Sequence, residues 1–340
     1  MIKGFENHGF LKGKKNLSKR VASNHESGKE AALFCCPAVF HWVTRYKSTK
    51  QKGKKLLGMV IGLKHLSWYS LNHKNHERKD RMRAKVIALV NEKGGVGKST
   101  SAATIGYILA QKKKKVLLID FDGQGHASLL CGVRNINQLQ ETTATLLNRI
   151  ICGEELPEAE SFLHRHKGVD LIPSNSQLFA LERNLSNADF RETKLQELTE
   201  RFREQYEYIL IDCMPNGGTT QINAMLSADE LIIPTQAEVF SAVGMTQLAR
   251  HSTIIQKNTG RRLKIAGVLI TMYDKRTSLS REVCGMLEEY KGIPIFKTRI
   301  PRSVKVGEAA LYGQTISEYA PNHPAALAYE ALVKELTENE

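Results

Sequence analysis

Long hydrophobic runs and cysteines at C-x-x-C spacing are both missing from this sequence of 340 residues. The apolar stretches 31–43 and 56–63 are too short to span a bilayer, and no convincing small-residue cleavage pattern of a secretory signal follows either of them. None of the six cysteines forms a C-x-x-C pair, which argues against a zinc or iron–sulfur site and is typical of a reducing compartment. We therefore expect a cytoplasmic protein with no membrane anchor.

Acidic residues are scarce only at the beginning of the chain. Residues 1–81 hold 18 Lys and Arg against 5 Asp and Glu, whereas the remainder holds 31 against 30. The net charge of +14 therefore belongs almost wholly to this leader, and the net charge of the remainder is no argument for nucleic-acid binding. Two interpretations of 1–81 stay open: a basic arm that contacts DNA or a membrane, or a disordered extension or start-site artefact. We favour the second, with one domain over 82–340, because Met82 lies three residues before the first predicted strand.

A glycine-rich stretch between a predicted strand and a predicted helix is the most informative feature. The apolar run 85–90 predicts a buried strand, and apolar residues recur at helical spacing over 102–109. A strand, a glycine-rich turn and a helix are the context of a phosphate-binding P-loop, in which backbone amides and the helix dipole face the phosphates. We expect Lys98 to contact the β- and γ-phosphates and the Ser99 hydroxyl to bind Mg²⁺. The predicted nucleotide-binding residues are Lys93, Gly94, Gly95, Val96, Gly97, Lys98, Ser99 and Thr100.

Carboxylates end two further apolar runs. Asp120 and Asp122 follow the run that begins at Lys115, and their spacing of two places both side chains on one side of an extended strand. Asp212 ends the run that begins at Tyr208. Because parallel strands end at one edge of a sheet, where ligands bind, these carboxylates are expected near the γ-phosphate and its metal. The predicted metal ligands are Ser99, Asp120 and Asp212.

Further strands are predicted over 169–173, 230–236 and 265–271, with helices over 190–202 and 241–257. Strands that alternate with helices predict an α/β fold, a doubly wound and mostly parallel sheet of the P-loop NTPase type with helices on both faces. Residues 141–206 carry no recognisable chemistry and are expected to be core and scaffold.

The P-loop departs from the usual G-x-x-x-x-G-K-[ST] pattern in one way. Its first position is Glu92, and a second lysine, Lys93, opens the string K-G-G-V-G-K-S-T. This resembles the deviant Walker A loop of the ParA/MinD family of ATPases. The resemblance implies that Lys93 crosses a dimer interface to the partner's nucleotide, so that Lys93, Lys98 and Asp122 form the catalytic set.

The two carboxylate segments resemble the same family. Asp122 matches the aspartate that positions or activates the attacking water, and Asp120 matches its neighbour near the metal. Gly123 stands where the family has proline and His126 where it has asparagine, which puts the rigidity of this loop in doubt. Asp212 matches the aspartate of the family's I-I-D-C-P-P segment, which holds Mg²⁺ directly or through a water.

The last third resembles the partition branch of the family, in the segments 272–277 and 300–309. The resemblance implies that Arg276 and Lys305 contribute to nonspecific DNA binding, with Arg302 as a third contact. Lys305 replaces an arginine, which keeps the charge but loses bidentate phosphate geometry. The alternative, ordinary solvated surface charge, stays open.

The resemblance implies a ParA-type partition ATPase. Such a protein binds ATP and Mg²⁺, forms a homodimer, binds DNA without sequence preference on the nucleoid, and slowly hydrolyses ATP to ADP and phosphate when a ParB-like partner stimulates it. The short, acid-rich end of the chain argues against a MinD-like membrane anchor. Two other functions remain as alternatives: a nucleotide-binding module that regulates replication or transcription, and a cargo-positioning ATPase of the same superfamily.

Overall fold

The computed structural model describes residues 83–238, 241–289 and 292–338. The leader 1–81, expected above as an extension, lies outside the described residues, and so does Met82. The boundary between the leader and the domain therefore stays a prediction.

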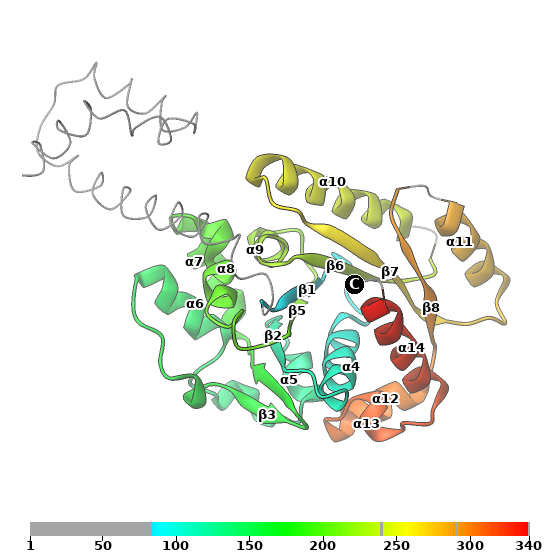
Figure 1. The fold of residues 1–340 in the computed structure, drawn as a ribbon, viewed down its shortest axis with the longest axis horizontal. Coiled ribbons are helices and arrows are strands. Elements are labelled where there is room, and N and C mark those ends of the chain that lie inside the picture. Colours follow the sequence, from blue (N-terminus) through cyan, green and yellow to red (C-terminus); the bar gives the residue numbers. More distant parts are fainter. Residues whose placement is uncertain (1–82, 239–240, 290–291, 339–340) are drawn as a thin grey trace, which may run out of the picture. The chain divides into compact units, whose positions relative to one another are not determined.

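One sheet of eight strands organises the described part of the chain (Figure 1). Its order is β3-β4-β2-β5-β1-β6-β7-β8, and every neighbouring pair is parallel except β3 and β4. The predicted fold class, a doubly wound and mostly parallel sheet, is confirmed. The strands are β1 (Lys85–Leu89), β2 (Val116–Phe121), β3 (His164–His166), β4 (Val169–Ile172), β5 (Tyr208–Cys213), β6 (Glu230–Gln236), β7 (Lys264–Tyr273) and β8 (Ile295–Pro301).

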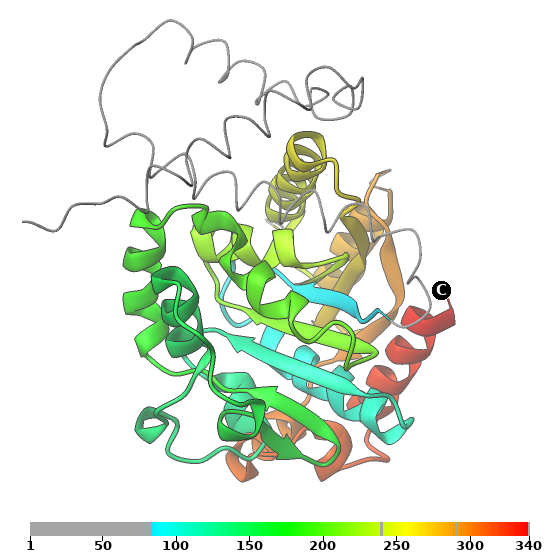
Figure 2. The same ribbon diagram turned by 60° about the vertical axis from the view of Figure 1, so that its left-hand side comes forward.

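Helices cover both faces of the sheet, and Figures 1 and 2 show α10 on one side of it and α14 on the other. One apolar layer joins the sheet to α6 through α11, and the other joins it to α4, α5, α13 and α14. The helices are α4 (Lys98–Gln111), α5 (His126–Leu130), α6 (Thr143–Cys152), α7 (Gln177–Asn187), α8 (Lys194–Glu200), α9 (Thr219–Ser227), α10 (Ser241–Thr259), α11 (Ser278–Glu289), α12 (Val304–Tyr312), α13 (Ile316–Tyr319) and α14 (Pro324–Glu338), with 3₁₀ turns η1 (Ile136–Gln138), η2 (Ala159–Ser161) and η3 (Arg191–Thr193).

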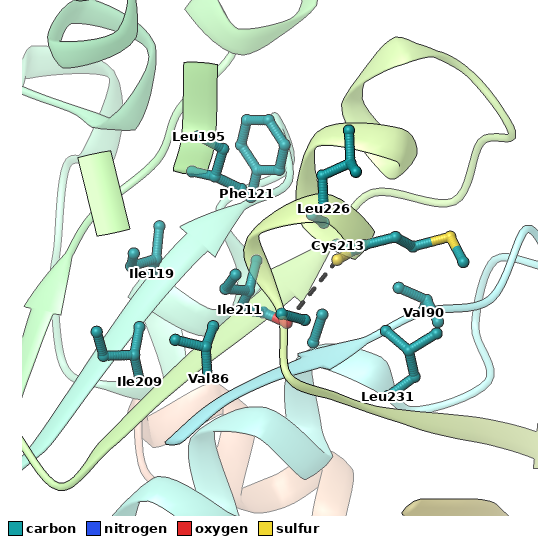
Figure 3. Packing of buried hydrophobic residues seen from close by; sticks show 14 of the residues in the cluster. Val86, Val90, Ile119, Phe121, Leu195, Ile209, Ile211, Cys213, Leu226 and Leu231 are labelled. Carbon is teal, nitrogen blue, oxygen red and sulfur yellow. Dashed lines mark hydrogen bonds between the residues drawn. The ribbon is translucent and has the colours of Figure 1, made fainter. Parts of the chain in front are cut away.

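The central strands β2 and β5 are buried at every residue, as strands covered on both faces must be. Figure 3 shows part of the first layer, in which Phe121 and Ile211 from the sheet pack with Leu195 of α8 and Leu226 of α9. Phe121 is fully buried, so truncation to alanine would cost about 3–5 kcal/mol. This packing fixes the strand ends that carry the candidate site.

The amphipathic helix expected over 190–202 is shorter than predicted. Phe190 has a φ of 52°, in the left-handed region, and a 3₁₀ turn separates it from α8, which begins at Lys194 and ends at Glu200. The apolar spacing of Leu195 and Leu198 did identify the buried face of α8. The backbone conformation at Phe190 is the reason that the helix does not extend further back.

Candidate nucleotide-binding site

The P-loop lies between β1 and α4, and two of its glycines adopt conformations that other residues rarely adopt. Gly95 has a φ of 73°, and Gly97, which caps the N-terminus of α4, has a φ of 87°. A side chain at either position would be strained. Val96 between them is fully buried. It anchors the loop in the core and offers only its backbone to a ligand.

Side chains from other strand ends hold the P-loop carbonyls from behind. The Thr271 hydroxyl at the end of β7 lies 2.8 Å from the carbonyl oxygen of Val96, and the Gln236 side-chain amide at the end of β6 donates to the carbonyl of Gly95 at 2.9 Å. Asn91 donates to the Pro234 carbonyl at 2.8 Å and accepts from the Lys93 amide at 2.9 Å. Sequence analysis missed all three residues, although each is a polar residue at the end of an apolar strand.

A cavity of about 470 Å³ opens over the P-loop, within the range of small-ligand and cofactor sites. The predicted nucleotide-binding residues that line it are Gly94, Gly95, Gly97, Lys98, Ser99 and Thr100. The predicted catalytic Asp122 also lines it, as do Gln124 and His126, which sequence analysis did not assign to the site. Lys93 and Val96 are not among the lining residues.

Lys98 is buried, and its ammonium group is folded back over the loop. Its Nζ donates to the carbonyls of Asn91 at 2.9 Å and Lys93 at 3.0 Å. Burial lowers the pKa of Lys98, and the negative charges of Asp212 and Asp122 oppose this shift. The ammonium group can turn to a phosphate at the cost of these two hydrogen bonds.

Lys93 does not line the cavity, and its ammonium group forms an ion pair with Glu238. Its side chain is 50% exposed. A long, exposed cation beside the cavity has the reach that a contact with a second subunit requires, but that contact stays a prediction.

Asp120 and Asp212 are direct neighbours on the parallel strands β2 and β5. Ser128 of α5 donates to Asp120 Oδ2 through its amide at 2.8 Å and its hydroxyl at 2.7 Å, and the Asp122 amide donates to Oδ1 at 3.2 Å. Burial raises the pKa of Asp120 to about 7, against these hydrogen bonds. Because both oxygens already have partners, a metal contact by Asp120 stays a prediction that would require it to exchange them.

Asp212 is also fully buried, and neither carboxylate oxygen accepts a hydrogen bond of acceptable geometry from the described residues. Burial, followed by the like charge of Asp120, raises its pKa well above the ordinary value. Ser99 opposes that shift, so its hydroxyl lies near the carboxylate although it is not positioned for a good hydrogen bond. Two oxygens without partners beside a serine hydroxyl are ligands of the kind that Mg²⁺ takes, so these residues fit the predicted metal.

Asp122 follows β2 at the edge of the cavity and is 5% exposed. Its Oδ1 accepts from the Gln124 amide at 2.9 Å, and its carbonyl accepts from the Gly125 amide at 3.0 Å. The two bonds close a tight turn over 122–125. This turn places a carboxylate in the wall of the cavity that the P-loop also lines.

The three predicted DNA contacts lie near the ends of β7 and β8. The exposed Arg276 donates to Asp274 at 2.8 and 2.9 Å, and Arg276, with a smaller contribution from Arg302, lowers the pKa of Asp274 to about 2. Lys305, in the first turn of α12, pairs with Glu308 at 2.6 Å. The structure thus brings Arg276 and Arg302 to the carboxylate of Asp274. Arg276 and Lys305 each form an ion pair with an acidic side chain.

Two negative findings concern only the part of the chain that the structure describes. None of its helices combines the length and the apolar character needed to cross a membrane. Within the same residues, no group of three or more His, Cys, Asp and Glu side chains could hold a metal ion by itself. Mg²⁺ is commonly held by one or two carboxylates together with substrate phosphates and waters.

The chain is similar in sequence to a known protein family and to named bacterial proteins. A family model described as an AAA domain matches residues 84–265, from the start of β1 into β7. The chain is 35% identical over 255 residues to the sporulation initiation inhibitor protein Soj of Bacillus subtilis, a match that covers 75% of this chain and 99% of that protein. It is 34% identical over 258 residues to the chromosome partitioning protein ParA of Caulobacter vibrioides, covering 75% and 95%.

The fold is similar to that of a solved structure that holds a nucleotide analogue. Cobyrinic acid a,c-diamide synthase from Mycobacterium smegmatis, with a bound ATP analogue and magnesium, is similar with a TM-score of 0.64 and 29% identity. The similarity covers 75% of this chain and 95% of that one. Another protein of similar fold thus binds an ATP analogue together with magnesium.

Proposed function

Because the chain belongs to the ParA family of P-loop ATPases, we propose that it is a partition switch: two copies close around ATP and the closed dimer binds DNA. Its cofactors are ATP and Mg²⁺. A ParB-like partner then stimulates slow hydrolysis to ADP and phosphate, and the dimer separates. The protein acts in the cytoplasm on the nucleoid, and its cargo is a plasmid, a chromosome or a mobile element.

One observation carries this proposal: the glycine loop, Ser99 and Asp122 line a single cavity, the buried carboxylate of Asp212 lies near Ser99, and the Lys93 side chain is 50% exposed. Gly94, Gly95 and Gly97 supply backbone amides to the phosphates, and Lys98 gives up its two carbonyl bonds to contact them. Asp212 and Ser99 would hold the metal, which when bound would neutralise charge on the phosphates. Asp122, which lines the same cavity, orients the attacking water.

Dimerisation requires Lys93 to exchange Glu238 for a phosphate of the partner subunit's nucleotide. The exchange replaces a largely exposed ion pair, which is worth at most about 1 kcal/mol, with a contact to a triphosphate in a closed interface. The nucleotide state therefore controls the association. In this account Lys93 is the residue that joins the two sites.

The test is DNA retention with ATP and with ADP, for the wild type and for Lys98→Ala. We expect retention only for the wild type with ATP. Equal retention under all four conditions would exclude a nucleotide-controlled switch.

One observation favours a second function. Arg276 and Lys305 each pair with an acidic side chain, which weakens them as a basic surface. A nucleotide-binding regulator that acts through a protein partner, or a cargo-positioning ATPase that does not move on DNA, needs no such surface. If ATP turnover stays at background with DNA and partner present, and Asp122→Ala changes nothing, the regulator is the better account. Turnover without ATP-dependent DNA retention favours the cargo-positioning ATPase.

A further inference from the structure

The aromatic ring of Phe179 covers the turn that follows Asp122. Gly123 occupies its second position, between the Asp122 carbonyl and the Gly125 amide that close the turn. A Cβ atom on Gly123 would lie 2.7, 2.8 and 2.9 Å from three atoms of the Phe179 ring. The ring therefore lies directly on the glycine, closer than a residue with a side chain would permit. Gly123 itself is buried although Phe179 is 46% exposed.

Phe179 reaches this turn from α7, and the helix is well anchored. Leu178, Leu181 and Leu185 are fully buried in the layer beneath α7. One turn further along the same face, Glu182 accepts a hydrogen bond from the Asn216 side-chain amide at 2.9 Å. One face of α7 therefore contacts both loops that follow the carboxylate-bearing strands β2 and β5.

Without the Phe179 ring, Gly123 would leave the backbone of the turn free to adopt more than one conformation. The second position of such a turn is where proline is favoured, because proline fixes φ near −65°. Glycine at this position restricts the backbone least of all residues. Gly123 does not have a left-handed φ, and its amide donates no hydrogen bond within the described residues, so the turn itself would accept proline.

We propose that Phe179 is a positioning residue for Asp122: its ring holds the Gly123 turn from outside and so restrains the backbone where the sequence supplies no proline. The proposal rests on the proposed function for its kinetic consequence, because Asp122 orients the attacking water. Its structural consequence, an ordered turn over 122–125, is independent of nucleotide.

The kinetic test compares Phe179→Ala with the double variant Phe179→Ala/Gly123→Pro. Releasing one backbone residue from a single conformation changes an equilibrium by about tenfold. We expect Phe179→Ala to lower kcat for ATP hydrolysis by about tenfold while KM changes less than about twofold, since the P-loop is untouched. Adding proline, with the ring gone, is expected to restore most of kcat. A purely structural role for the ring would give no such rescue.

Ile254→Ala on α10 is the matched control, because Ile254 is 43% exposed and lies away from the turn in the sequence and the sheet order. Phe179→Leu, which keeps an apolar contact, replaces the alanine variant if that one does not fold. Unchanged kcat in Phe179→Ala, or a double variant no faster than Phe179→Ala, would overturn the proposal.

A second readout needs no hydrolysis. Hydrogen exchange of the Gln124 and Gly125 amides, measured on the full chain without nucleotide, reports whether the turn is closed. We expect at least about fivefold faster exchange in Phe179→Ala and recovery in the double variant. Unchanged exchange would refute the contact as a restraint. If the exchange behaves as expected but the wild type shows no turnover that depends on Asp122, the proposed function fails and the positioning of the turn stands.

Discussion

Replacing Asp120 by asparagine tests whether the buried carboxyl group of Asp120 makes the free energy of unfolding depend on pH. The pKa of Asp120 is raised from 3.8 to about 7 by burial, with the like charge of Asp122 as a smaller cause. Between these two values the folded protein holds a proton that the unfolded chain has released. The free energy of unfolding therefore falls as pH rises through this window.

The magnitude follows from the width of the window. About three pH units at about 1.4 kcal/mol each give about 4 kcal/mol of stability that is present at pH 4 and lost by pH 7. The asparagine side chain of the Asp120→Asn variant would have no such titration, and its carbonyl oxygen can still accept from Ser128. The stability of the wild type relative to Asp120→Asn should thus decrease by about 4 kcal/mol between pH 4 and pH 7.

The assay is urea unfolding of both proteins at half-unit pH steps, with EDTA and without nucleotide. Asp170→Asn, in the neighbouring strand β4, controls for the loss of one negative charge. A difference between wild type and Asp120→Asn that is independent of pH, or that increases with pH, would refute the argument that burial dominates over the Ser128 hydrogen bonds.

Three other predictions concern the P-loop and the predicted DNA contacts. Thr271→Val removes the hydroxyl that lies against the Val96 carbonyl. The free energy of unfolding, measured by chemical denaturation, should fall by about 1–3 kcal/mol, and ATP binding, measured by calorimetry, should weaken. Unchanged values would show that the P-loop keeps its conformation without this contact. Gly97→Ala puts a side chain at a φ of 87°, which should lower the free energy of unfolding by about 1–2 kcal/mol and disrupt nucleotide binding. Normal nucleotide binding would contradict the assignment of this loop as the phosphate-binding site. Arg276→Ala and Lys305→Ala should each lower the slope of log affinity for DNA against log salt by about one unit, measured by anisotropy with ATP present, whereas an unchanged slope for both would remove them from the DNA-binding surface.

The sequence was sufficient for the parts of the site that depend on local order. A phosphate cradle needs glycines and a lysine in fixed succession between a strand and a helix, and the carboxylates of Asp122 and Asp212 follow apolar runs that form parallel strands. Strand ends converge wherever the sheet is parallel. The family and its fold follow from these same segments, and the similarity to Soj and ParA proteins confirms that assignment.

Contacts between distant segments could not be predicted in this way. Thr271 lies 175 residues along the chain from Val96, whose carbonyl it contacts. The hydrophobic periodicity of the sequence does not predict a contact between residues so far apart. The partners of Asp120 depend on where α5 presents Ser128. Residues 141–206 were expected to be scaffold only, yet α7 within them places Phe179 on the turn of Asp122. A glycine where proline is usual was the only sign of that contact in the sequence.

In the proposed switch a triphosphate joins two copies of this chain, and the molar mass in solution tests this most directly. Sedimentation equilibrium with Mg²⁺ and a hydrolysis-resistant ATP analogue should give twice the mass of the 38.1 kDa chain, and with ADP the single mass. Lys93→Ala should bind the analogue and stay monomeric, while Lys112→Ala, an exposed lysine at the other end of α4, should dimerise normally. A wild type that remains monomeric with the bound analogue and magnesium would contradict the account.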